Sequence, residues 1–222
     1  MLPTYLHKLI SELDNHISSE QLAAVMRTPF HQYWKIPDIP VSSRFIIAVL
    51  KQWDSNNTSL NIASKALSFT AEDLSVVLGI KAHGRQVQLR SLQKKSKTLR
   101  DLFKSSTTNA DHQMLMEMLW MLAGRTDEEG VNDFVRTFVL MVFNTVLFPT
   151  KIFRIPPKLF VYVDNIEELA CYNWGRAVHE FLVVSIRRFL EKKGLQKLID
   201  QNNITYIDGC IVGVLVSDYI YI

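Results

Sequence analysis

Few residues in this 222-residue chain stand at spacings that could carry out chemistry. His179-Glu180 matches half of a zinc-protease motif, which needs a second histidine one helical turn further on. Val183 stands at that place, so no pair of zinc ligands is predicted. Cys171 and His179 could form a thiol–imidazole pair if the chain folded back between them, although a lone cysteine is more often a small buried apolar residue. The pattern therefore favours structural roles for these side chains.

The acidic residues also favour structural roles. Asp73 stands three residues after Thr70, which is the spacing of a capping box, so a helix cap is favoured over a catalytic carboxylate. Glu128-Glu129 fit solvated acids in the first turn of a helix. Two cysteines, Cys171 and Cys210, are too few for a disulfide framework or a structural zinc site, and a single bridge between them is left open. We therefore predict a protein without catalytic residues, cofactor or metal.

One basic segment is the strongest candidate for a binding site. Residues 81–104 hold eight Lys or Arg against one acid, Asp101, a net charge of +7 in a chain whose total is +3. No Phe, Tyr or Trp precedes Phe103 in this segment, so it suits phosphate contact and lacks a stacking platform for single strands. The alternatives are a solvated loop, contact with nucleic acid or an acidic partner, and a localisation signal at residues 94–97. The candidate contact residues are Lys81, Arg85, Arg90, Lys94, Lys95, Lys97 and Arg100.

The longest apolar stretch, residues 131–148, predicts the helix around which the chain is built. Large apolar side chains cover every side of its helical projection after the first turn, so other helices must surround it. Its charge-free part, residues 137–149, is shorter than the roughly 20 apolar residues that cross a bilayer, and it contains Asn144-Thr145. We therefore expect a buried core helix and no membrane segment.

Capping signals and apolar residues at helical spacing indicate the other elements. Ser18 followed by Gln21 has the form of a capping box, and Asn173 is expected to be an N-cap. Helices are expected at residues 6–17, 19–27, 44–53, 71–78, 110–123 and 174–193, with a short one starting at Thr98. Gly79 and Gly194 are expected to end two of them. A small hairpin is predicted at residues 59–62 and 66–69. In the helix at 110–123, the residues expected to face inward are Met114, Leu115, Met118, Leu119 and Leu122.

These elements predict a mostly α fold, a single globular helical domain around the central helix with at most a small β-hairpin. Hydrophobic residues make up 48% of the chain and charged residues 21%, as in ordinary ordered proteins. We expect residues 1–41 to form an N-terminal helical segment that packs on a domain at residues 42–222. The apolar end at residues 220–222 suggests a domain cut from a longer protein. No signal peptide is indicated, and a reducing compartment is expected.

Three segments carry a family resemblance. Residues 67–87, LSFTAEDLSVVLGIKAHGRQV, are similar to a signature T-x-x-D-V-x-x-x-L-G-L-x-x-x-G, and residues 138–149 resemble an apolar helix that ends in Leu-Phe-Pro. Residues 172–182, YNWGRAVHEFL, are similar to an aromatic-x-Trp-Gly segment that opens a helix. Together they resemble the plant mobile domain, also called the aminotransferase-like plant mobile domain, of transposons and "maintenance of meristems" proteins. The matching residues with structural roles are Thr70, Asp73, Gly79, Gly84, Trp174 and Gly175.

The resemblance implies a nuclear plant protein related to transposable elements that acts in gene silencing, genome stability or development. It implies protein partners, such as phosphatase-like or silencing factors, and no aminotransferase activity. Ile80 replaces the usual Leu and the last helix lacks the family's Trp, which leaves open a related transposon-associated domain found beside Ulp1-type proteases. A DNA-associating module using the basic segment is the alternative function, and a homo-oligomer is left open. A hydrolase or nuclease remnant is the least favoured class.

Overall fold

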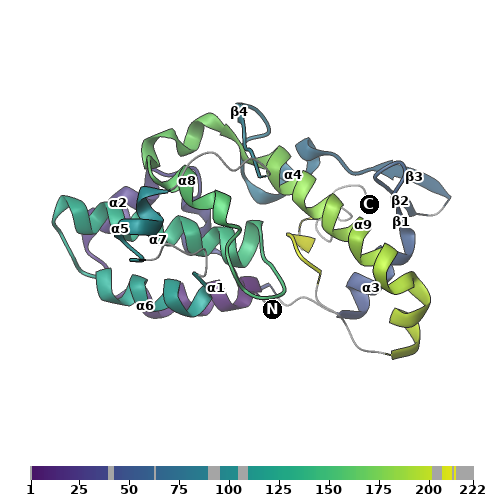
Figure 1. The fold of residues 1–222 in the computed structure, drawn as a ribbon, viewed down its shortest axis with the longest axis horizontal. Coiled ribbons are helices and arrows are strands. Elements are labelled where there is room, and N and C mark those ends of the chain that lie inside the picture. The colour runs from purple at the N-terminus through teal and green to yellow at the C-terminus, as the bar shows by residue number, and fades with distance from the viewer. Residues whose placement is uncertain are drawn as a thin grey trace. The chain divides into compact units, whose positions relative to one another are not determined.

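The computed structural model describes residues 2–39, 43–62, 64–89, 96–104, 110–201, 207–211 and 213. Helices dominate these residues, which confirms the predicted mostly α class (Figure 1). The chain divides into two compact units, each built from two stretches of sequence. Unit 1 comprises residues 1–39 and 87–172, and unit 2 comprises residues 40–86 and 173–222. The predicted division into residues 1–41 and 42–222 stays a prediction.

Unit 1 is organised around α7. This helix, Glu128–Val142, continues into the π-helical turn η2, Phe143–Leu147. Every residue from Thr137 to Phe148 is buried, as predicted for the central helix. By length and composition Glu128–Leu147 could cross a membrane, but 83% of its apolar window is buried inside the protein. It is therefore the core helix of this unit.

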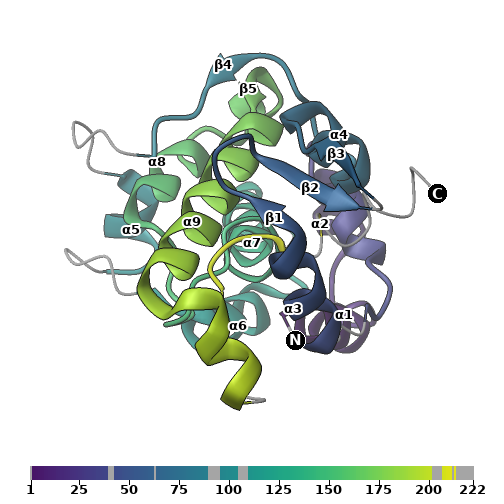
Figure 2. The same cartoon turned by 90° about the vertical axis from the view of Figure 1, so that its right-hand side faces the viewer.

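The other helices of unit 1 surround α7 (Figures 1 and 2). They are α1 (Leu2–Leu13), α2 (Ser19–Met26), α5 (Lys97–Asp101), α6 (His112–Leu122) and α8 (Phe160–Val163). Three 3₁₀ turns join them, at His31–Lys35, Pro157–Leu159 and Ile166–Cys171. The predicted capping box of α2 is present, because the side chains of Ser18 and Gln21 each accept a hydrogen bond from the other's backbone N–H.

Aromatic rings fill the space beside α7. Trp34 lies against Phe134 and Phe138, with ring centroids 6.1 and 5.4 Å apart. Phe30 meets Phe143 edge to face at 5.3 Å. Such pairs stabilise a core beyond their buried area by about 1 kcal/mol each. These contacts come from the turn after α2, so the N-terminal residues supply part of the core of unit 1.

Unit 2 combines three helices with a small sheet. The helices are α3 (Ser43–Gln52), α4 (Ala71–Leu78) and α9 (Trp174–Gln201), and α9 packs against both α3 and α4. Strands β1 (Trp53–Asp54), β2 (Ser59–Ile62) and β3 (Lys65–Ser68) form an antiparallel sheet in that order. Leu60 pairs with Trp53 on one side and with Leu67 on the other. The short strand β4 (Arg85–Gln86) ends the first stretch of unit 2, and β5 (Tyr172–Asn173) spans the boundary where the second stretch begins.

The hairpin prediction is confirmed at β2 and β3, and β1 adds a third strand. The expectation that Gly194 ends the last helix is wrong, because α9 continues to Gln201. A glycine inside a helix costs only about 1 kcal/mol relative to alanine, so it does not by itself stop one. The apolar end at residues 220–222 lies outside the described residues.

Candidate interaction surface

The first motif segment forms the two ends of α4. Thr70 and Asp73 make a capping box: the Asp73 N–H donates to Thr70 Oγ1 at 3.1 Å and the Thr70 N–H donates to Asp73 Oδ2 at 3.0 Å. Gly79 caps the other end with a φ of 64°, a conformation that favours glycine. Gly84 also has a positive φ, 124°. The Asp73 carboxylate therefore serves the helix end, as the spacing predicts.

The third motif segment starts α9 and joins it to α4. Trp174 is buried, and the Gly175 N–H donates to the Lys81 carbonyl oxygen at 2.9 Å. A Cβ placed at Gly175 would collide with Ser75 Oγ on α4, so only glycine allows this approach. Asn173 is the predicted N-cap: its Oδ1 accepts from the Arg176 N–H, and its Nδ2 donates to the Ala82 carbonyl at 2.6 Å. The motif residues thus interlock two helices of unit 2.

The side chains considered for catalysis have structural environments in the described residues. His179 Nε2 lies 2.9 Å from the Phe69 carbonyl oxygen, and its ring lies against the Phe69 ring. Burial raises the pKa of the Cys210 thiol to about 12, so its nucleophilic thiolate is suppressed. Cys171 is an exposed free cysteine. Within the described ranges, no group of three or more His, Cys, Asp or Glu is placed to hold a metal ion.

The predicted basic residues are distributed over both units. Lys81 and Arg85 are exposed in unit 2, and Lys97 and Arg100 are exposed on α5 of unit 1. Arg90, Lys94 and Lys95 lie outside the described residues. The Arg100 guanidinium pairs with Asp101 at 2.6 Å, and this bond lowers the pKa of the Asp101 carboxyl. Lys97 and Arg100 share one face of α5 because they are three residues apart.

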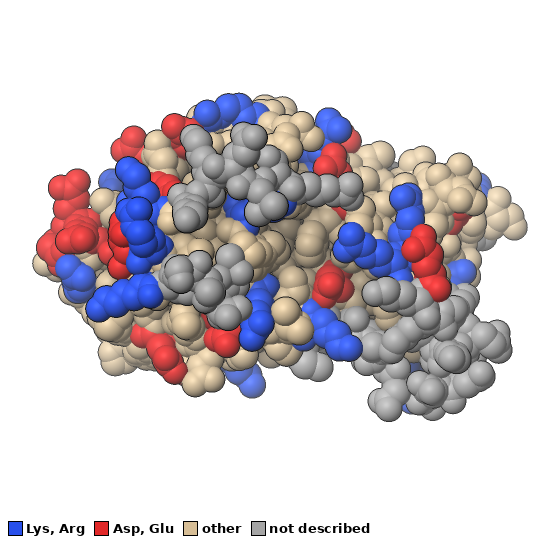
Figure 3. All heavy atoms as spheres, in the orientation of Figure 1, with Lys and Arg blue, Asp and Glu red and all other residues tan. Residues whose placement is uncertain are grey.

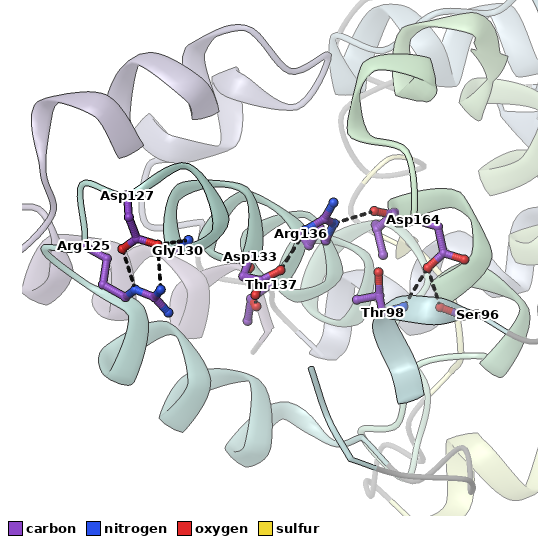
Figure 4. Close-up of polar contacts among 10 residues, drawn as sticks. Ser96, Thr98, Arg125, Asp127, Gly130, Asp133, Arg136, Thr137 and Asp164 are labelled. Atoms are coloured by element: carbon purple, nitrogen blue, oxygen red, sulfur yellow. Dashed lines mark hydrogen bonds and ion pairs between the residues drawn. The ribbon is translucent and has the colours of Figure 1, made fainter. Parts of the chain in front are cut away.

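Asp164 fixes the start of α5 (Figure 4). Its carboxylate accepts hydrogen bonds from the Ser96 hydroxyl at 2.8 Å and from the Lys97 and Thr98 N–H groups at 3.0 and 2.8 Å. The helix starts at Lys97, one residue before the predicted Thr98, and Ser96 is its N-cap, since its Oγ accepts from the Leu99 N–H. The Asp164 carboxylate, at the end of α8, thereby accepts hydrogen bonds from two backbone amides in the first turn of α5.

A second polar link shown in Figure 4 joins α7 to α8. The Arg136 guanidinium forms a partly buried ion pair with Asp133 at 2.7 Å, and its Nε donates to the Val163 carbonyl at 3.3 Å. The hydrogen bond from Arg136 occupies a helix-end carbonyl that would otherwise need water. The segment that ends in Asp164 is thus held to the core helix, and α5 is held to that segment.

Exposed apolar side chains of unit 1 gather on α6, where sequence analysis missed them. Leu115, Leu119 and Leu122 are buried as predicted, but the expectation that Met114 faces inward is wrong. Met114 is 37% exposed, Trp120 38% and Met121 66%. Met118, the other methionine predicted to face inward, is half-buried. We call the exposed set Gln113, Met114, Glu117, Trp120 and Met121 the outer face of α6.

The wrong prediction that Met114 faces inward has a physical cause. Gln113 and Glu117 are polar and one turn apart, so they mark the solvent side of α6, but three large apolar side chains beside them, Met114, Trp120 and Met121, obscure this stripe. In the structure α6 touches α7 on one side and α1 on another and leaves the side of Gln113 and Glu117 open. The signal that could have found the surface is this polar pair together with the methionine content of the run 112–122, since methionine is common at adaptable binding surfaces.

The charged residue of this face is acidic, and further acids lie near α6 in the sequence or on its neighbour α1. Glu117 lies within the face, exposed and hydrogen-bonded to Gln113. The hydroxyl of Tyr5 on α1 donates to Met116 Sδ on α6 at 3.0 Å. The pKa of Tyr5 is raised, mainly by burial and also by the negative charge of Glu12 on the same helix. Three further acids, residues 127–129, follow the turn after α6. Figure 3 shows acidic side chains at the left end of unit 1, where this turn lies in Figure 1, with Lys and Arg side chains beside them.

Most of the cationic charge near this turn is already paired. The Arg125 guanidinium forms two hydrogen bonds with the Asp127 carboxylate, at 2.6 and 2.9 Å (Figure 4). These bonds and the Gly130 N–H lower the pKa of the Asp127 carboxyl to about 2. Asp127 is also the N-cap of α7, so it stays charged at the positive end of that helix.

Comparison with known proteins gives one family and one curated relative. The family model described as "Domain of unknown function (DUF8566)" matches residues 1–214. "Protein MAIN-LIKE 2" of Arabidopsis thaliana is 21% identical over 174 residues, which cover 75% of this chain and 26% of that protein. This similarity supports the link to the plant mobile domain, and no solved structure matches. Because the family model covers nearly the whole sequence, the chain belongs to the DUF8566 family.

Proposed function

We propose that this chain is a non-enzymatic protein-interaction domain of a nuclear plant protein related to transposable elements. The role in gene silencing, genome stability or development, through protein partners, rests on the motif resemblance and on the similarity to the MAIN-like protein. Since the chain spans 26% of that relative, the domain is expected to act as one part of a larger protein. The core helix α7 packs against α6 and so supports the outer face of α6 within unit 1.

The outer face of α6 carries the proposal. It presents three large apolar side chains to solvent, Met114, Trp120 and Met121, on a helix of 11 residues. Contiguous exposed apolar surface is costly to keep in water and marks sites of interaction. Tryptophan is also among the residues that contribute most to binding energy at interfaces. Of the side chains considered for catalysis, Asp73 caps a helix and His179 contacts a backbone carbonyl, so surface contact is the favoured use of the domain.

Affinity purification from plant nuclei tests this proposal. The wild-type chain is compared with Met121→Lys, which places a charge on the outer face, and with Val76→Lys, a matched change at a residue that is 74% exposed on α4. Proteins that bind the wild type and Val76→Lys but not Met121→Lys are expected. If no protein is recovered, or if recovery is the same for all three folded chains, the proposal is wrong.

A DNA-associating module is the second candidate, and the geometry of α5 favours it. Asp164 holds the helix so that Lys97 and Arg100 extend into solvent from the same face. The predicted measurement is binding to duplex DNA at low salt by the wild type, with loss when the seven basic residues, from Lys81 to Arg100, are neutralised together. Binding that is absent, or that persists in the neutralised chain, would exclude this function.

A further inference from the structure

The character of the outer face of α6 indicates what kind of partner it receives, an inference that rests on the proposed function. We propose that the partner contributes an amphipathic helix with Lys or Arg residues beside its apolar stripe. The apolar part of the argument comes from Met114 and Met121, which are seven residues apart and therefore lie on the same side of α6 two turns apart. Their separation of about 10 Å along the axis matches two turns of a second helix.

Helix-on-helix docking suits the side chains present. Methionine is unbranched and adapts to the shape of an incoming apolar group, and grooves that accept amphipathic helices are often rich in it. Trp120 lies on the α1 side of the face, where its ring meets His16 edge to face at 5.2 Å. That contact fixes the indole while leaving 38% of the residue exposed to a partner. A rigid aromatic side chain beside flexible methionines is a typical anchor at an interface.

The charges select a basic partner. Glu117 lies between Met114 and Met121 in sequence and is exposed. A partner side chain that covers it therefore either offers a cation to its carboxylate or, if acidic, is repelled by it. Glu117 is the one charged residue among the five that make up the outer face, so the formal charge of this face is −1. Arg125, beside the acids that follow the turn after α6, adds no free cation there, because it is already paired with Asp127. Complementary charge speeds and orients association, whereas like charges oppose it.

The same charges disfavour two other occupants. In a second copy of this chain, the outer face would bring its own Glu117 against the Glu117 of the first, and like charges oppose association. An anionic membrane would be repelled, because such membranes attract Lys and Arg rather than carboxylates. A basic amphipathic helix is the occupant that satisfies both the apolar and the acidic features.

Binding of designed peptides to the full chain tests this inference. The probes are two fluorescent helical peptides of equal length with the same leucine stripe, one flanked by lysines and the other by glutamates. We expect the lysine peptide to bind at least about ten-fold more tightly, because charge complementarity favours it. Glu117→Lys and Met121→Ser should each weaken its binding about ten-fold, and Val76→Ser on α4 should leave it unchanged. Circular dichroism verifies that each variant is folded.

Three results would overturn the inference: equal binding of the two peptides, binding that Glu117→Lys and Met121→Ser do not weaken, or binding to anionic phospholipid vesicles that depends on Met121. The result of this peptide test can be distinguished from the result of the purification that tests the proposed function. If the nuclear purification yields a partner that depends on Met121 while the peptides bind equally, only the nature of the partner is wrong. If no partner depends on Met121, the proposed function itself fails.

Discussion

Gly175 illustrates how a single residue holds two helices of unit 2 together. Its N–H binds the Lys81 carbonyl, and its missing side chain leaves room for Ser75 of α4. We predict that Gly175→Ala destabilises the chain by about 1–3 kcal/mol, as overpacking does in well-packed cores. Chemical denaturation of the folded variant measures this loss.

The collision with Ser75 supplies the control for that prediction. Ser75→Ala removes the hydroxyl that a Cβ at position 175 would strike, so the double variant should recover part of the loss. Recovery appears as non-additivity in a double-mutant cycle. Equal losses for Gly175→Ala with and without Ser75→Ala would show that the close approach does not depend on this pair.

Asp127 makes stability depend on acid pH. Its folded pKa of about 2 lies below the unfolded value of about 3.9, so its contribution is present above pH ~4 and is lost as pH falls through 2. Asp127→Asn keeps a capping side chain but removes the charge that binds Arg125. We predict that the melting temperatures of the wild type and this variant differ near pH ~6 and converge toward pH ~2. A constant difference over that range would contradict the assignment.

The roles of some residues could be predicted from local sequence and others could not. Thr70, Asp73 and Gly79 act where their spacing places them, because a cap depends on neighbours within one turn. Asn173 likewise caps α9 as predicted. Met114 shows the limit: its exposure depends on which sides of α6 other helices cover, and the sequence of α6 alone does not encode that.

At the scale of elements, α5 depends on a carboxylate from another part of unit 1. Asp164 accepts from two of its backbone amides and from Ser96. We predict that Asp164→Ala costs about 1 kcal/mol of local stability, like other lost caps, and that the Leu102 amide, which donates to the Thr98 carbonyl, exchanges hydrogen roughly five-fold faster.

Asp101→Ala is the matched control for α5. It removes an acid of the same helix whose pair with Arg100 is exposed, and such pairs contribute little. Its effect on exchange at Leu102 should be small compared with that of Asp164→Ala. If the two variants behaved alike, the cap from Asp164 would not be what orders α5.

Helix positions followed from sequence better than helix ends. α2, α3, α4 and α6 lie within a few residues of their predicted ranges. The central helix was predicted as one helix, whereas its last turn is π-helical, with the Phe148 N–H bound to the Phe143 carbonyl. In that turn Asn144 donates to the Phe153 carbonyl, a contact with a later loop that periodicity cannot reveal. α9 passes Gly194 because one glycine is a weak stop signal.

At the scale of the whole molecule, the two compact units differ in which segments they bury and which they leave exposed. Unit 1 buries α7, which holds the second resemblance segment, and leaves the outer face of α6 open, whereas unit 2 packs the helices of the first and third segments against each other. The mostly α class and the burial of the central helix followed from composition and from an apolar run that leaves its helix without a polar side. The interaction surface required coordinates, because it is defined by what no neighbouring helix covers among the described residues.

The measurement that tests this account most directly is site-specific photocrosslinking in plant nuclei. A photoreactive phenylalanine analogue replaces Met121 in one chain and Val76 in another, both exposed positions on helices. We predict crosslinks to a protein from position 121, lost when Glu117→Lys is added, and none from position 76. Crosslinks that arise equally from both positions, or none from position 121, would contradict the claim that the outer face of α6 is where this domain binds its partner.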